Sequence, residues 1–289
     1  MIPEFLKQYW NNYKNHNDIH AGLALYRFFD ASENQKNKSL EIISKINNFD
    51  TASKIFLERQ KKHLESLKLR GYSVCSFKLT TASRLACGLG ISSLAENGFF
   101  MDRVWGIPYL PGSSLKGIAQ DWALIELDVF TEKQNRRETK RLNKDFIAIF
   151  GAQSAEEGEI MDKYWKDRKG TVIFLDAVPI LENISPYDID IVNPHYSDYY
   201  SSKGDKPPAD YERPNPNFFL TVKKEIKFQF AIAAKDAKFQ FQDKEGKEID
   251  VDISAQKLLS NATQYLQNAL QEHGIGAKTH IGNGYFKCS

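Results

Sequence analysis

Glycines gather near the last residues of the sequence, in the segment GIGAKTHIGNGYF at positions 274–286. Glycine lets backbone N–H groups turn toward one point and lets another backbone come close. A lysine charge and a threonine hydroxyl can hold the same phosphate. The segment therefore predicts an anion site at Gly274, Gly276, Lys278 and Thr279. The alternative is a helix-ending glycine followed by a tight turn at 282–284, which explains only some of the glycines.

A second candidate site is the segment YLPGSSLKG at 109–117. A Pro-Gly break before a helix leaves free N–H groups in the first helical turn, where they and the helix dipole attract phosphate. Gly112, Ser113, Ser114 and Lys116 would supply the contacts. The GxxxxGK[ST] spacing is absent, which argues against a nucleotide hydrolase. An ordinary helix start capped by Ser113 or Ser114 is the commoner explanation of such a segment.

Two weaker basic segments accompany these sites. RLACGLG at 84–90 places Arg84 beside two glycines, and loop geometry alone would explain those glycines. RRETKRLNK at 136–144 carries five Lys and Arg residues. On a helix such residues mostly form a solvated face, and RNA contact is the alternative.

Catalytic and metal-binding groups are sparse in the sequence. No histidine lies in a triad, an HExxH motif or a paired-His spacing. His195 and His280 could serve as a general acid or base in RNA cleavage, although a structural or solvated histidine is commoner. Cys75, Cys87 and Cys288 form no CxxC motif and have no histidine at metal spacing. We expect reduced thiols and neither a metal nor a cofactor.

Composition limits the class of protein. The 289 residues are 42% hydrophobic and 12% aromatic, which is enough for a substantial core and excludes global disorder. The net charge of +2, from 39 basic and 37 acidic residues, gives no strong nucleic-acid signature but can hide a basic stripe. The start MIPEFLKQYW has no signal-peptide pattern, and no apolar run reaches the ~20 residues that cross a bilayer. We expect a soluble, cytoplasmic protein.

Residues 1–70 have helical spacing of apolar positions. The first helix is expected within DIHAGLALYRFF, with Asn17 or Asp18 as N-cap. Two further helices should follow between 39 and 69, separated by NNFD at 47–50, and the second should end at Gly71. No linker rich in glycine or proline follows, so we expect a packed helical N-terminal extension.

From residue 71 onward the apolar pattern alternates between strand and helix periods. The helix before the glycine-rich segment should start at Asp252 or Ser254, and the stretch 182–217, rich in proline and tyrosine, is expected to be a long irregular insertion. The segment at 218–234 fits either one strand or a hairpin. The expected elements are strands at 72–81, 170–180, 218–234 and 281–288, and helices at 113–127, 136–151 and 252–274. This order predicts an α+β, ferredoxin-like βαββαβ sheet with its helices on one face.

Several motifs together resemble those of the RAMP superfamily, and within it the sixth subunits of type III-B (Cmr) CRISPR effector complexes. They are RLACGLG, GIPYLPGSSLKG, FGAQ, DIVNPHYSDYY and GIGAKT. The resemblance covers residues 71–289 through motifs and 1–70 only in helical character. It implies an RRM-like RAMP domain at 71–289 with a glycine-rich C-terminal loop.

The resemblance also implies a role. It suggests a non-catalytic subunit at the head of the effector filament, near the 3′ part of the CRISPR RNA (crRNA), that supports target-RNA cleavage by other subunits. Its expected partners are crRNA, target RNA, the backbone RAMP subunit and the first subunit. The residues expected to touch RNA are Gly112, Ser113, Ser114, Lys116, Arg84, Gly274, Gly276, Lys278 and Thr279. The insertion at 182–217 would dock a neighbouring subunit or, alternatively, lie beside the guide–target duplex.

Two other functions remain open from the sequence. One is a metal-independent RAMP endoribonuclease that processes crRNA, with His195 or His280 as base. The other is a pure protein–protein adaptor. The nuclease would cleave RNA without magnesium, and the adaptor would show no salt-sensitive RNA binding.

Overall fold

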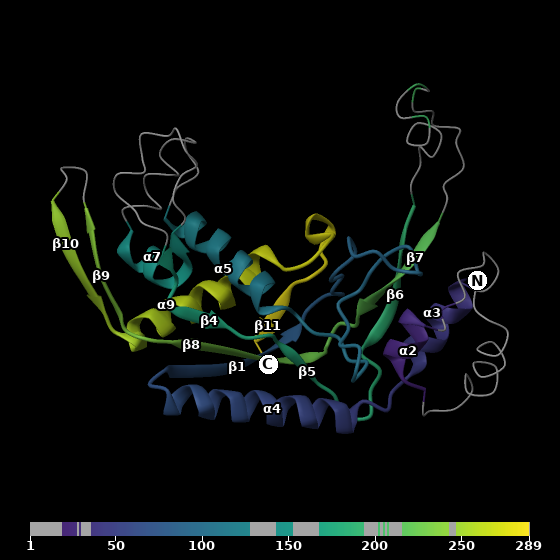
Figure 1. Ribbon diagram of the computed structural model, residues 1–289. Helices are drawn as coiled ribbons and strands as arrows, with labels where there is room; N and C mark the ends of the chain where they lie inside the picture. The colour runs from purple at the N-terminus through teal and green to yellow at the C-terminus, as the bar shows by residue number, and fades with distance from the viewer. Residues whose placement is uncertain are drawn as a thin grey trace.

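The structure is a computed structural model that describes residues 19–27, 29, 36–127, 143–152, 168–193, 202, 205, 207, 216–242 and 247–288 (Figure 1). The helical elements are α2 (Ala21–Tyr26), α3 (Lys36–Lys45), α4 (Asp50–Leu69), α5 (Gly112–Glu126), α7 (Lys144–Phe150), α9 (Ala255–Asn268), the π-helical turn η1 (Ala269–His273) and the 3-10 turn η2 (Thr279–Ile281). The strands are β1 (Ser73–Thr81), β2 (Gly151–Ala152), β3 (Arg168–Lys169), β4 (Val172–Phe174), β5 (Val178–Ile180), β6 (Tyr187–Val192), β7 (Asn217–Val222), β8 (Lys227–Ala234), β9 (Ala237–Gln242), β10 (Glu248–Ile253) and β11 (Phe286–Cys288).

The central sheet has the strand order β11-β1-β8-β4, and β5 also pairs with β8. All of these pairings are antiparallel. Helix α5 follows β1 and helix α9 precedes β11, which gives the βαββαβ order that the sequence predicts. The ferredoxin-like RAMP fold is therefore confirmed. Aromatic side chains lock the middle of the sheet: Phe77 stacks on Phe230 with ring centroids 5.2 Å apart, and Phe286 meets Phe230 edge-on at 5.5 Å.

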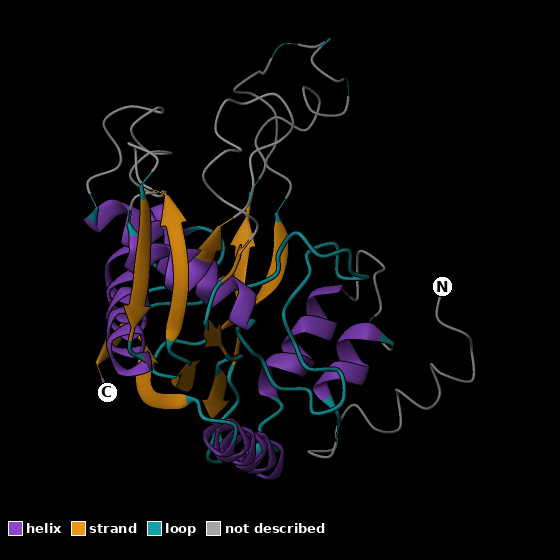
Figure 2. Ribbon diagram, turned by 60° about the vertical axis from the view of Figure 1, so that its left-hand side comes forward, coloured by secondary structure: helices purple, strands orange, loops and turns teal. Residues whose placement is uncertain are grey.

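Helices cover both faces of this sheet. Helices α5 and α9 lie on one face, and α4 lies along the other (Figures 1 and 2). Helix α9 forms as the sequence predicts, because Ser254 caps it by accepting a hydrogen bond from the N–H of Lys257 at 3.4 Å. Its apolar side, at spacings of three and four residues, is buried and includes Leu258, Ala262 and Leu266.

Helix α4 is joined to the sheet by a buried polar contact. The Ser53 hydroxyl donates to the carbonyl of Pro179 at 2.9 Å and accepts from the N–H of Leu181 at 3.0 Å. The break between α3 and α4 falls at NNFD as predicted, and Gly71 follows α4 with a φ of +79°. Helix α2 starts later than predicted, because the His20 ring accepts from the Leu23 N–H at 3.2 Å. Asn17 and Asp18 lie outside the described residues.

Two predicted strands have a different form in the structure. The segment 170–180 is divided into β4 and β5, because Ala177 leaves the line of β8 to exchange backbone hydrogen bonds with Leu110 at 2.9 and 3.0 Å. The segment at 218–234 is neither one strand nor a hairpin. Its first half, β7, pairs with β6, and its second half, β8, pairs with β1. The hairpin of β9 and β10 was not predicted at all.

The insertion at 182–217 is partly regular, so the expectation of an irregular stretch is wrong for 187–192 and for Asn217. Strand β6 pairs with β7 from Tyr187–Val222 to Val192–Asn217, as a separate two-stranded sheet. The side chain of Tyr187 is fully buried and packs edge-on against Phe49 and Phe99. His195 and the other tyrosines of the insertion lie outside the described residues.

The expected helix at 136–151 is described only as α7, which Asn143 caps and Gly151 ends with a φ of +90°. Most of the basic segment 136–144 lies outside the described residues. None of the helices that the structure describes combines the length and the apolar character needed to cross a membrane.

Candidate nucleic-acid interface

The glycine-rich loop and the Arg84 segment lie side by side, although they are far apart in the sequence. The N–H of Ala277 donates to the carbonyl of Ala86 at 2.7 Å, and the N–H of Gly284 donates to the carbonyl of Arg84 at 2.7 Å. The loop is closed on itself by the N–H of Ile275, which donates to Gly284 at 3.0 Å. Two of the segments predicted to contact RNA therefore form one structural unit.

Close approach of protein backbone explains two of the loop glycines. At Gly276, where φ is +93°, an added Cβ would lie 2.3 Å from the carbonyl oxygen of Ala86. At Gly284, where φ is +83°, it would lie 2.0 Å from the carbonyl oxygen of Ile275. Gly282 has a φ of +96° and open space around it. The loop thus needs its glycines for its own fold, whatever else it contacts.

The ammonium group of Lys278 is directed into the protein. It donates to the carbonyl of Ile191 at 2.9 Å, lies 4.4 Å from the ring centroid of Phe219 and lies 3.9 Å from Asp190 Oδ2. Only 19% of the side chain is exposed. Lys278 therefore ties the glycine-rich loop to strands β6 and β7, and little of its surface is available to a ligand.

Arg84 takes part in the same connection. Its Nε donates to Asp188 Oδ2 at 2.8 Å, and its Nη1 lies 3.9 Å from Asp190 Oδ1. The Asn283 side chain donates to Asp190 at 3.4 Å. We call Arg84, Asp188, Asp190, Lys278 and Asn283 the Asp190 cluster. Its two cations and two carboxylates balance, so it offers little net charge to a phosphate.

The neighbouring turn of the loop includes an exposed histidine. Thr279 opens the turn η2, where its carbonyl accepts from the Tyr285 hydroxyl at 3.5 Å. His280, in the same turn, is exposed, and no described residue hydrogen-bonds its ring. Nothing in this part of the chain positions His280 against a second catalytic group.

The start of α5 is built differently from the predicted serine-capped start. The N-cap is Pro111, and neither Ser113 nor Ser114 caps the helix. Instead the carboxylate of Asp176 accepts from the Gly112 N–H at 2.7 Å. Gly112 is buried, and a Cβ there would lie 2.1 Å from the Phe174 carbonyl oxygen. Gly112 therefore serves the packing of α5 on the sheet, and Asp176 occupies one N–H that could have faced an anion.

Sequence reasoning missed Asp176 because isolated aspartates are too common to single out. The available signal was its place inside the segment 170–180, where a charged residue interrupts an apolar strand. That interruption coincides with the division between β4 and β5.

Two lysines near the start of α5 lack a carboxylate partner among the described residues. Burial and the nearby charge of Lys169 lower the pKa of Lys116. Among the described residues, neither Lys116 nor Lys169 has a carboxylate partner. Ser113, one turn away, is exposed. We call Lys116 and Lys169 the lysine pair; an anion bound there would relieve the repulsion between them.

Lys169 was not a predicted site residue. It lies on β3, next to Gly170, whose added Cβ would be 2.3 Å from the Ile149 carbonyl oxygen. This tight packing of β3 near the end of α7 could not be foreseen from spacing. The predicted residues fall into two groups. One lies at the start of α5 (Gly112, Ser113, Ser114 and Lys116), and the other lies in or beside the glycine-rich loop (Arg84, Gly274, Gly276, Lys278 and Thr279).

Among the described residues, the cysteines and acidic residues form neither a reactive thiol site nor a metal site. Burial raises the pKa of the Cys87 thiol to about 12, so this thiol stays protonated and unreactive. Cys75 is half-buried and Cys288 is exposed, and all three are free. The described residues contain no group of His, Cys, Asp and Glu that could hold a metal ion.

Comparisons with known proteins agree with this fold. The family description "RAMP superfamily" matches residues 78–287. The chain is 31% identical to the CRISPR system Cmr subunit Cmr6 of Pyrococcus furiosus, over 86% of this chain and 80% of that protein. It is 28% identical to the Cmr6 subunit of Saccharolobus solfataricus, over 63% of this chain and 52% of that protein.

A solved structure supports the fold independently. A chain in the cryo-EM structure of the Type III-B Cmr-beta bound to cognate target RNA matches with a TM-score of 0.57 at 21% identity, over 99% of this chain and 84% of that one. The family match covers most of the described sheet, helices α5 and α9, and the glycine-rich loop. The chain belongs to the RAMP superfamily and, within it, to the Cmr6 family of type III-B CRISPR effector subunits.

Proposed function

We propose that this chain is a non-catalytic subunit that binds the 3′ part of crRNA at the head of a type III-B effector filament. In that position it contacts the backbone RAMP subunit and the first subunit, and supports cleavage of target RNA by the complex. The relatives that it resembles are named as Cmr subunits, and one similar structure holds a target RNA. Because the chain belongs to this family, we interpret its binding sites as those of an effector subunit.

The observation that carries the RNA-binding proposal is the lysine pair. Two neighbouring cations without a described carboxylate partner, beside an exposed serine at a helix start, suit the phosphates of an RNA backbone. Such contacts fix the position of a strand without reading its sequence. A guide-binding subunit needs that property, because spacer sequences differ from one crRNA to the next.

The absence of catalysis is part of the same proposal. His280 is exposed and has no described hydrogen-bond partner that would orient it as a base. His195 lies outside the described residues. We expect the isolated chain to leave repeat RNA intact in magnesium-free buffer, and His280→Ala to leave target cleavage by the complex unchanged. RNA cleavage by the wild-type chain that disappears in His280→Ala or His195→Ala would instead establish the processing nuclease.

The lysine pair can be tested by salt-dependent RNA binding. We expect the double variant Lys116→Ala/Lys169→Ala to weaken binding of single-stranded RNA equally for unrelated sequences. Each lost phosphate contact should lower the slope of log K against log salt by about 0.7. Fluorescence anisotropy with the full chain at several salt concentrations measures both quantities.

The matched control is Lys61→Ala/Lys62→Ala. These two lysines are exposed on α4, which lies on the opposite face of the sheet. The control removes the same charge from the molecule and should leave the salt slope unchanged. Equal losses in the two double variants would mean that the lysine pair is no specific site.

A further inference from the structure

One edge of the central sheet is only partly covered. Strand β11 pairs with β1 at Leu79, Thr80 and Thr81 alone. From Ser73 to Lys78 this edge of β1 has no strand partner among the residues that the structure describes. An uncovered strand edge is a template for pairing with another chain.

The backbone groups that point outward can be assigned from the hydrogen bonds around them. The N–H of Thr81 donates to Ile226 on the β8 side, at 2.9 Å, and the N–H of Ala82 donates to Tyr285 on the β11 side, at 2.8 Å. Backbone groups alternate between the two edges of an antiparallel strand. Val74, Ser76 and Lys78 therefore turn their N–H and C=O groups to the uncovered edge.

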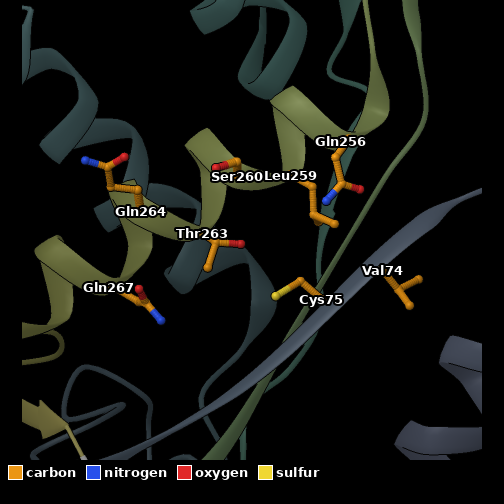
Figure 3. Close-up of a pocket in the computed structure, with 8 residues that line it drawn as sticks. All are labelled: Val74, Cys75, Gln256, Leu259, Ser260, Thr263, Gln264 and Gln267. Carbon is orange, nitrogen blue, oxygen red and sulfur yellow. The ribbon is translucent and has the colours of Figure 1, made fainter.

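A pocket of about 530 Å³ lies beside this edge, between β1 and α9 (Figure 3). Strand β1 contributes Val74 and Cys75, and α9 contributes one leucine and five side chains with hydroxyl or amide groups. None of the lining residues is charged. The lining can hydrogen-bond a neutral polar or apolar group, but it offers no cation for a phosphate.

One atom of the lining has no hydrogen bond. The Thr263 hydroxyl oxygen is buried and lacks a partner. A buried hydroxyl without a partner is destabilising, so such atoms are rare in folded proteins. In Figure 3, Thr263 and Cys75 flank the same space from opposite sides. This oxygen has no exposed surface of its own, so it bears on the packing of α9 and not on what the pocket holds.

We propose that an extended segment of a neighbouring protein subunit adds to β1 at Ser73–Lys78 as a further strand, in line with β11. Its backbone pairs with Val74, Ser76 and Lys78, and its uncharged side chains enter the pocket. This inference rests on the proposed function, because the neighbour is another subunit of the effector complex.

The chemistry of the edge favours a polypeptide over RNA. A strand edge presents N–H and C=O groups in alternation, which an extended peptide matches and a phosphate chain does not. The pocket lacks the lysines and arginines that hold a nucleic-acid backbone. The existing pairing of β11 with Leu79–Thr81 shows that this edge accepts a strand, and leaves the adjoining positions in the same line.

Hydrogen–deuterium exchange measures the edge directly. We compare the purified chain with the effector complex isolated through a tag on another subunit. The amides of Val74, Ser76 and Lys78 should exchange about tenfold or more slowly in the complex. The amides of Cys75 and Phe77, already paired with β8, should change much less. Equal exchange of the outward amides in both samples would overturn the inference while leaving the subunit assignment intact.

A photo-crosslinking amino acid at Gln264, on the rim of the pocket, identifies the occupant. A crosslink to an extended segment of another subunit, found by mass spectrometry, supports the proposal. A crosslink to RNA or to a second copy of the chain overturns it. Failure of the chain to join any effector complex would refute the proposed function, and this inference with it.

A pair of variants at Ser76 tests the backbone contact. Ser76→Pro removes one outward N–H without removing a hydrogen bond to β8, and Ser76→Ala keeps that N–H. We expect the Gln264 crosslink to fall about tenfold in Ser76→Pro and to persist in Ser76→Ala, with thermal unfolding compared for both. An undiminished crosslink in a folded Ser76→Pro variant would contradict strand addition.

Discussion

Gly276 and Gly282 share a backbone conformation but have different surroundings. Both have φ values in the left-handed region, +93° and +96°. An added Cβ at Gly276 would collide with a carbonyl oxygen, whereas one at Gly282 would meet nothing within 4 Å. Substitutions at these two glycines can therefore distinguish the cost of backbone strain from the cost of steric overlap within one loop.

Alanine substitutions should show this difference in stability. For Gly282→Ala we expect a loss of about 1–2 kcal/mol from the left-handed conformation alone. For Gly276→Ala we expect about 2–5 kcal/mol, because overpacking against Ala86 adds to that strain. Urea denaturation of the two variants measures the difference. Similar losses would mean that the loop can move away from Ala86.

At this scale the sequence predicted residue types better than their partners. The sequence singled out the loop glycines, Lys278 and Arg84 as candidate contacts with RNA, but the close approach at Gly276 is to the protein's own backbone. The partners Asp190 and Lys169 lie far away along the chain, so no local spacing could reveal them. Contact of these residues with RNA remains a prediction.

Among the elements, α5 depends on an acceptor from a different segment. Its first residue is held by Asp176, from the break between β4 and β5, and its own serines do not cap it. This contact fixes the helix start against the sheet. It also places a carboxylate at the end of the helix where an anion would otherwise bind.

We expect Asp176→Ala to destabilise the fold by about 1 kcal/mol through loss of the capping hydrogen bond. Asp176→Asn keeps an acceptor oxygen and should lose less. Thermal unfolding of both variants measures the effect. If alanine and asparagine were equally destabilising, the carboxylate charge would matter more than the hydrogen bond.

The Asp190 cluster fastens the β6–β7 sheet to the glycine-rich loop. Asp190 is 18% exposed and lies near both Arg84 and Lys278. Its removal leaves these two cations without a shared counter-charge. We expect Asp190→Ala to lower the free energy of unfolding by about 1.5–3 kcal/mol, the range for hydrogen bonds to charged groups.

The same variant should speed amide exchange in β6 and in residues 274–284. The matched control is Glu225→Ala, which breaks the exposed ion pair between Glu225 and Lys287 and should change stability by less than about 1 kcal/mol. Unchanged exchange in Asp190→Ala would show that the loop and the β6–β7 sheet are held together by other contacts.

Elements with a long, regular spacing of apolar residues were the ones that could be predicted. Helices α4 and α9 and strand β1 have long, regular patterns, and the structure contains them near the expected positions. Strands β9 (AKFQFQ) and β10 (EIDVDI) were missed although both alternate apolar and polar residues, which is the pattern of a half-buried strand. The division of 170–180 depends on backbone bonds to Leu110, which sequence patterns do not encode.

Across the whole molecule, the helices before β1 complete the core. Helix α4 covers the face of the sheet opposite α5 and α9, and the buried Ser53 joins it to the end of β5. Deleting residues 1–70 would expose that face of β1, β5 and β8. The ferredoxin-like order was predictable from the alternation of elements, but this cover was not, because helical patterns do not reveal which surface they bury.

We therefore expect a fragment of residues 71–289 to aggregate or to lack cooperative unfolding. Circular dichroism and size-exclusion chromatography of the fragment and of the full chain test this. Adding residues 1–70 as a separate polypeptide during refolding should restore soluble material if the interface is intact. A monomeric fragment with a sharp thermal transition would show that the extension is a dispensable module.

The position of α4 also restricts how this fold can treat a nucleic acid. In an RRM, aromatic side chains on the open face of the sheet stack against two or three bases, and this stacking provides much of the sequence selectivity. Here the 20-residue helix α4 covers that face. This face of β1 and β8 therefore offers no platform on which bases could stack. Under the proposed function, such a subunit would accept guides of any spacer sequence, because the sheet would read none of their bases.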